Sequence, residues 1–132
     1  MEARLFDDML PFTFQIRAVV HHSLGAIRGV QVGAFAPPGG TPPANYAGLQ
    51  SLVISAHADL KKVTPEEVNA CAGKEVIFTV RDMKLPFTAE GFLQSFSLPN
   101  FYFHATTAYD ILRNKGVPVG KRDFLGRMKL KS

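Results

Sequence analysis

The chain has only one cysteine and no tryptophan among its 132 residues, and it lacks any long apolar run. The single Cys71 excludes an intramolecular disulfide and fits a reducing compartment. Its neighbours Ala70 and Ala72 indicate a small buried side chain rather than a reactive thiol. No segment approaches the ~18–20 apolar residues that span a bilayer, and the first residues do not resemble a signal peptide. We therefore expect a cytoplasmic protein with no membrane partner.

Acidic residues are scarce near the C-terminus, where residues 116–132 form a basic tail. Such a tail can attract anions, but a solvated terminus explains it as well. Only Phe124 supplies an aromatic ring there, so no stacking platform for bases is visible. We do not expect a nucleic-acid partner. With 46% hydrophobic and 20% charged residues, the chain is typical of a single globular domain over residues 1–132.

Apolar spacing predicts helices over about 12–32 and 45–62, separated by a proline- and glycine-rich loop at 33–44. Thr64 and Pro65 start a short helix. The β-branched run at 75–80 predicts a hairpin over about 75–87. A last helix over 88–114 follows, rich in aromatic residues and expected to be deeply buried, with a kink near Gln94 and Ser95 caused by Pro99. The predicted class is an all-α bundle with a small hairpin before its last helix.

The last helix and its exit, residues 98–113 and 116–126, carry a specific pattern that includes Leu98-Pro99-Asn100-Phe101 and Phe103-His104. This pattern resembles domain-of-unknown-function family 1993, a branch of the DinB-like superfamily, and the segment from Ala3 to Met9 resembles the same family. The resemblance implies a DinB-like four-helix bundle. Relatives usually begin with another helix ahead of the Ala3 segment, so we expect a bundle that lacks its first helix.

The resemblance also implies histidine ligands for a divalent ion such as Zn²⁺ or Ni²⁺. His22 and His104 match two ligand positions, whereas Ser95 stands where bacterial relatives have a further histidine. Serine is a poor substitute for imidazole, so we expect no complete metal site and no cofactor. If the positions carry over, Ser95→His would raise the metal affinity. We expect His21 to face solvent, and His57 is a weak candidate for a substitute ligand.

Polar and aromatic side chains are dense on the last helix, which suits a cavity for a small, largely apolar molecule. His104 and His22 are the candidate acid or base groups, with Tyr102 as a hydrogen-bond donor. Candidate ligand-binding residues are Asn100, Thr107, Tyr109 and Ser95. A packed core with its hydroxyls bonded to the backbone explains these residues equally well.

Three functions follow from these residues and remain open. The first is binding of a small apolar molecule, with metal-independent acid/base catalysis at His104 and His22. The second is a metal-dependent DinB-like enzyme that uses the same two histidines. The third is a non-catalytic interaction or structural protein with a degenerate site. Because a bundle without one helix would expose apolar surface, we also expect a homodimer, with Phe6, Leu10 and Phe12 near its centre.

Overall fold

The structure, a computed structural model, describes residues 1–131, and its central element is a long helix over residues 12–32. This helix has three consecutive segments: α1 (Phe12–Val20), the π-helical η1 (His21–Gly25) and α2 (Ala26–Val32). Gly33 ends it in the left-handed conformation at φ 77°, which glycine adopts without strain. The predicted helix is confirmed, but the π-helical turn within it was not foreseen.

Two shorter helices follow the proline-rich loop. Helix α3 (Tyr46–Leu60) begins at Asn45, whose side chain accepts a hydrogen bond from the Gly48 N–H. Helix α4 (Pro65–Asn69) has the capping box expected at Thr64, in which the Thr64 and Glu67 side chains each accept from the other's backbone N–H. Cys71 is buried just beyond α4.

The last long helix is irregular where Pro99 predicts a defect. It comprises α5 (Ala89–Gly91), the π-helical η2 (Phe92–Ser97) and α6 (Leu98–Asn114). Pro99 has no N–H to donate to the carbonyl four residues earlier, which belongs to Ser95. The π-helical turn η2 includes Ser95. Such turns are a common local adjustment where the regular hydrogen-bond pattern of an α-helix is interrupted. The π-helical turn includes Gln94 and Ser95, where the sequence predicted a kink, and the kink itself stays a prediction.

A three-stranded sheet corrects the all-α prediction. The predicted hairpin is present as antiparallel β2 (Glu75–Val80) and β3 (Met83–Thr88), but β1 (Ala34–Phe35) adds a third strand, parallel to β2. The Ile77 N–H donates to the Gly33 carbonyl at 3.0 Å, and Phe35 is buried. The start of the predicted 33–44 loop therefore pairs with the sheet because Phe35 anchors it in the core.

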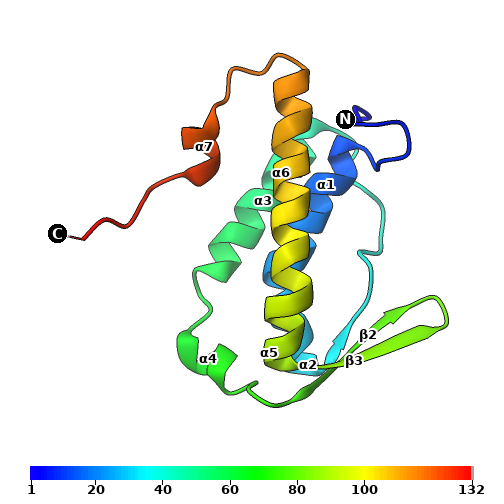
Figure 1. The fold of residues 1–132 in the computed structure, drawn as a ribbon, viewed down its shortest axis with the longest axis vertical. Helices are drawn as coiled ribbons and strands as arrows, with labels where there is room; N and C mark the ends of the chain where they lie inside the picture. The colour runs from blue at the N-terminus through cyan, green and yellow to red at the C-terminus, as the bar shows by residue number, and fades with distance from the viewer. Residues whose placement is uncertain (132) are drawn as a thin grey trace.

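The long helices pack around the 12–32 helix, as Figure 1 shows. Both α3 and α6 pack against α1 and make few contacts with each other. One core cluster lies between α2, the sheet and η2, and a second lies between α1, α3 and α6. The hairpin projects from one end of the molecule. The expectation that one helix of the bundle is missing stays a prediction.

Several burial predictions were wrong. Phe12, which we placed at a dimer centre, lies inside the second core cluster. The last helix is not deeply buried on all sides, since Tyr102 and Phe103 are 54% and 57% exposed.

The basic tail contains a short helix, α7 (Lys121–Leu125), that was not predicted. No helix within residues 1–131 is both long enough and apolar enough to cross a membrane.

Candidate functional site

Two histidines that are distant in sequence meet between the first and last long helices. His22 lies on η1 and His104 on α6, and their ring centroids are 5.9 Å apart with an interplanar angle of 13°. Both rings are half-buried. The pair is surrounded by aromatic side chains, with Phe96 against His22 and Phe14 against His104. The structure thus brings together the two residues predicted as the chemical centre.

A buried glutamine holds the His104 ring. The Gln15 Nε2 donates to the Leu10 carbonyl at 2.8 Å, which leaves the Gln15 Oε1 as an acceptor. That oxygen lies 2.7 Å from His104 Nδ1, so Nδ1 carries the proton and donates. The neutral His104 ring therefore has its lone pair on Nε2.

A buried serine holds the His22 ring in the same tautomer. The Ser97 hydroxyl donates its only proton to the His22 carbonyl at 3.0 Å. The same oxygen lies 3.3 Å from His22 Nδ1, so it accepts from an Nδ1–H. Both histidines thus place the lone pair on Nε2. Among the described residues, no hydrogen bond engages either Nε2.

Burial keeps both histidines neutral. Burial, together with the neighbouring His21 and His104, lowers the pKa of His22 to about 4. Burial also lowers the pKa of His104 below its usual value. Because a buried imidazole loses hydration when it is charged, the neutral ring is favoured. At neutral pH the two Nε2 atoms are therefore hydrogen-bond acceptors or metal ligands.

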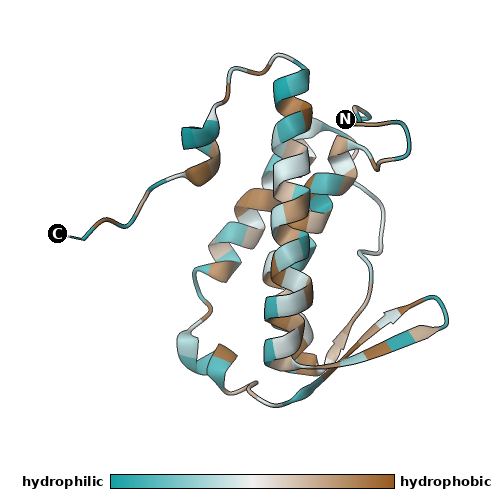
Figure 2. Cartoon of the chain, in the orientation of Figure 1, coloured by the Kyte–Doolittle hydropathy of each residue, from teal (hydrophilic) through white to brown (hydrophobic). Residues whose placement is uncertain are grey.

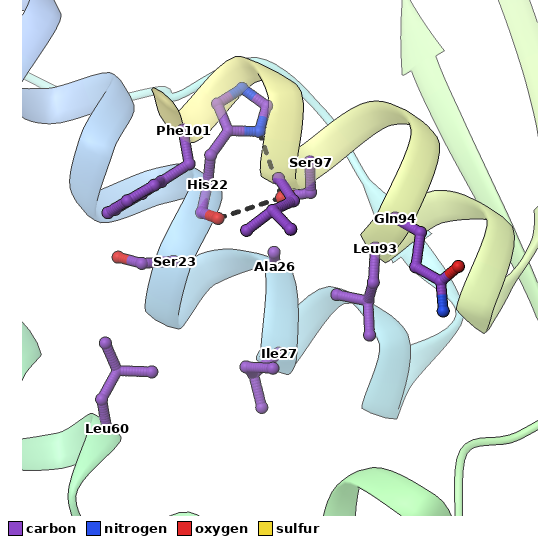
Figure 3. A pocket seen from close by; sticks show the side chains of 10 residues that line it. His22, Ser23, Ala26, Ile27, Leu60, Leu93, Gln94, Ser97 and Phe101 are labelled. Carbon is purple, nitrogen blue, oxygen red and sulfur yellow. Dashed lines mark hydrogen bonds between the residues drawn. The ribbon is translucent and has the colours of Figure 1, made fainter. Parts of the chain in front are cut away.

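An open pocket of about 290 Å³ lies beside His22, between the 12–32 helix, the end of α3 and the start of α6 (Figure 3). Ala26 and Ile27 form part of its floor, and Leu60 faces Phe101 across it. The Ser97 hydroxyl is turned toward His22. The lining is almost entirely apolar and consists of His22, Ser23, Ala26, Ile27, Leu60, Leu93, Gln94, Ser97, Leu98 and Phe101.

The other predicted site residues lie apart from this pocket lining. Asn100 and Thr107 donate to the backbone carbonyls of Phe96 and Phe103, each at 2.8 Å. Ser95 is exposed, and its hydroxyl donates to the Gly91 carbonyl. These polar side chains donate to backbone carbonyls of their own helix. The sequence had left this open as the alternative to ligand binding.

The two tyrosines predicted as site residues also lie elsewhere. Tyr102 is more than half exposed, and Tyr109 packs against Phe124 of α7 with ring centroids 5.6 Å apart. Neither ring lines the pocket beside His22.

The remaining histidines do not complete a metal centre. His21, expected to face solvent, stacks on Phe35 with centroids 4.2 Å apart and donates from Nε2 to the Ala36 carbonyl at 2.6 Å. His57 is exposed on α3. Across the part of the chain that the structure describes, no three His, Cys, Asp or Glu side chains gather to hold an ion. The donor set therefore does not fit a site with three protein ligands.

Comparison with known families decides the relationship. Residues 1–125 match the model of a domain of unknown function, DUF1993. The chain belongs to the DUF1993 family. A solved structure of a DinB family member protein from Shewanella denitrificans is similar in fold, with a TM-score of 0.80 and 25% sequence identity. That match covers 99% of this chain and 74% of the other. No functionally curated protein matches the chain.

Gln15 and Ser97 are the members of this DUF1993 site that sequence reasoning missed. Gln15 is 2% exposed and Ser97 is 1% exposed. The signal for Ser97 was helical spacing: it stands seven residues before His104, about two turns, so both face the same side. Gln15 likewise precedes His22 by seven residues. A polar residue two turns from a candidate histidine could have been flagged in each case.

Proposed function

We propose that this DUF1993 protein binds a small, largely apolar molecule in the pocket beside His22, with the neutral His22 Nε2 accepting one hydrogen bond from it. The apolar pocket supports the class of ligand, because burial of apolar surface is the main source of affinity in such sites. The fixed tautomer leaves the His22 Nε2 as an acceptor, and Figure 3 shows this nitrogen on the side of the ring away from Ala26 and Ile27, so the polar end of the ligand must reach past the ring. A ligand with one hydroxyl or N–H and a compact hydrocarbon body suits both.

The pKa of His22 defines its role. A ring with a pKa of about 4 is unprotonated at neutral pH and cannot serve there as a general acid. Its Nε2 accepts a hydrogen bond at neutral pH instead. The Nε2 of His104 is the second position at which a base could act. Any acid/base step in this proposal therefore uses the histidines as bases, and the ligand supplies the proton.

Two compounds that differ by one hydroxyl group test the proposal: 4-methylphenol, which has it, and toluene, which lacks it. We expect 4-methylphenol to give saturable NMR shifts at residues that line the pocket, such as Ala26 and Phe101. One added hydrogen bond of ~0.5–1.5 kcal/mol makes its affinity roughly two- to tenfold higher than that of toluene.

Two variants locate the binding. Replacing His22 by Leu should remove the preference for 4-methylphenol, and Leu98→Trp should fill the pocket and weaken both compounds. Shifts that are non-saturable or scattered over the surface would contradict the proposal. They would favour a protein that acts through its surface alone.

A divalent metal is the second candidate, favoured by the two free Nε2 atoms. Metal-binding histidines commonly have Nδ1–H bonded to an oxygen, as both rings do here. With only two protein ligands, binding of Zn²⁺ or Ni²⁺ should be weak. Elemental analysis after chelator-free purification should find well below one ion per chain. About one ion per chain would overturn this expectation.

Ser95→His tests the position taken from the resemblance. Ser95 stands two residues before Ser97, roughly half a turn around the helix, and it is exposed. On this geometry the substitution should leave zinc affinity unchanged in a competition titration. A gain in affinity would show that the Ser95 position reaches the histidine pair.

A further inference from the structure

An apolar furrow runs along the 12–32 helix between α3 and α6. The pocket beside His22 occupies one end of it, and a second pocket of about 270 Å³ occupies the other. This second pocket lies between Phe12 and Ile16 of α1, residues 46–54 of α3, and Leu112 of α6. The furrow exists because α3 and α6 both pack on α1 but hardly touch each other. From Phe12 to Ile27 the floor is about 22 Å long at 1.5 Å per residue.

The helices that border the furrow lack charge. Residues 46–58 of α3 contain no Asp, Glu, Lys or Arg, and neither do residues 92–109 of η2 and α6. Exposed helices in water normally alternate apolar and charged faces. Depletion of charge over a partly apolar surface is instead typical of the centre of a protein interface. Charges return at the furrow's end, where Arg28 pairs with Asp59 at 3.3 Å.

Apolar side chains stand out from the border of the furrow. Ile54 is 68% exposed, and Tyr46 and Val53 on the same helix are also exposed. The middle of α3 is accordingly brown in Figure 2. On the opposite border Leu98 and Tyr102 are exposed. The surface thus carries an apolar ridge, formed by Tyr46, Val53 and Ile54, beside an apolar hollow.

We propose that this furrow binds the same furrow of a second copy of the chain, in a two-fold symmetric dimer. A ridge beside a hollow is self-complementary, because a two-fold axis places the ridge of each copy in the hollow of the other. The net charge of +4 lies in the basic tail, where residues 116–132 hold five Lys or Arg and one Asp, so two tails would repel each other. The uncharged borders make this face free of that repulsion.

The available area supports a stable dimer. A face about 22 Å long and about three helix diameters wide, ~30 Å, projects ~660 Å², and its hollow adds accessible surface. A standard interface takes ~800 Å² from each partner. The second copy would also close the pocket beside His22. The dimer itself does not depend on the small-molecule proposal.

Sedimentation equilibrium at micromolar concentration tests this interface. The wild-type chain should have twice the 14.5 kDa mass of one chain. Ile54→Arg and Gln50→Arg each place a charge on the furrow border at an exposed position, so both should sediment as folded monomers with unchanged helical circular dichroism. Val32→Arg is the matched control, because Val32 is 75% exposed but lies outside the furrow, and it should remain dimeric.

Two results would overturn the proposal. A wild-type monomer at these concentrations would show that no second copy covers the furrow. Dimers of undiminished stability in both Ile54→Arg and Gln50→Arg would place the interface elsewhere. Binding of 4-methylphenol can be measured on the same samples, so failure of the pocket and failure of the dimer are separately visible.

Discussion

The His22 ring is neutral because the protein surrounds it with aromatic rings and two other imidazoles. Its pKa of about 4 is well below the usual 6.5, so the unfolded chain binds a proton at a higher pH than the folded chain. The stabilising contribution is complete above about pH 6.5 and is lost as the pH falls toward 4. The burial-lowered pKa values of His21 and His104 act in the same direction.

We therefore expect the free energy of unfolding to decrease between pH 6.5 and pH 4. His22 should contribute about 1–2 kcal/mol of this decrease, once solvent screening of a half-exposed ring is allowed for. Urea unfolding at several pH values measures the slope, and His22→Gln should flatten it. Asn69→Gln, at an exposed position of α4, provides a control and should retain the wild-type slope. Equal slopes for both variants would show that His22 does not titrate in this way.

Gln15 links two segments through one buried amide. Its side chain bonds the Leu10 carbonyl and His104 Nδ1, so replacement by Leu leaves both groups without a partner. We expect Gln15→Leu to lower the free energy of unfolding by ~1–3 kcal/mol. Gln31→Leu, at an exposed position of α2 that lines neither pocket of the furrow, should change it by less than about 0.5 kcal/mol. Similar losses in the free energy of unfolding for the two variants would contradict a structural role for Gln15.

The residues of the site were only partly predictable from the sequence. His22 and His104 were identified by resemblance, whereas Tyr102 and Tyr109 were chosen for chemistry and proved to lie away from the pocket. Residue type alone does not reveal which face of a helix turns inward. Ser97 and Gln15 were missed because serine and glutamine are ordinary surface residues, and only the packing of two helices buries them.

At the scale of elements, the sequence predicted those helix ends and strands that depend on a few neighbouring residues. The sequence predicted the end of the 12–32 helix at Gly33, the start of α4 at Thr64 and the β-branched strand at 75–80. These features could be predicted because helix caps and strand propensities act over a few residues. Strand β1 could not be predicted, because its two residues stand before a proline-rich segment and are too few to show a strand pattern. Its pairing with β2 depends on a contact across more than forty residues of sequence, as in Ala34 with Ile77.

Phe35 is the side chain that holds β1 in place. It is buried and packs against Phe92 with ring centroids 4.9 Å apart, and it stacks on His21. We expect Phe35→Ala to cost ~3–5 kcal/mol, as for other buried aromatic residues. Hydrogen exchange at Ile77, whose N–H bonds the Gly33 carbonyl, should accelerate. Phe103→Ala is the exposed control, and an equal loss there would argue against a special role for Phe35.

The whole molecule combines a half-buried pair of histidines with an apolar side that its own helices do not cover. The histidine pair lies between the 12–32 helix and α6, and the pocket beside His22 opens into the furrow. Covering the furrow would therefore change the surroundings of the pocket. In the proposed dimer, assembly and ligand access are coupled, because the same surface serves both.

The dye 1-anilino-8-naphthalenesulfonate, which fluoresces on exposed apolar surface, measures this coupling. In the proposed wild-type dimer the furrow would be covered, so fluorescence should be low. The monomeric Ile54→Arg variant should bind the dye with several-fold higher fluorescence, and 4-methylphenol should exchange from its pocket faster on the NMR timescale. Val32→Arg adds the same positive charge outside the furrow, so it controls for attraction of the anionic dye and should match the wild type. Equal fluorescence in Ile54→Arg and Val32→Arg would mean that the furrow is equally accessible in both. Assembly would then leave the pocket open, and ligand entry would be independent of the second copy.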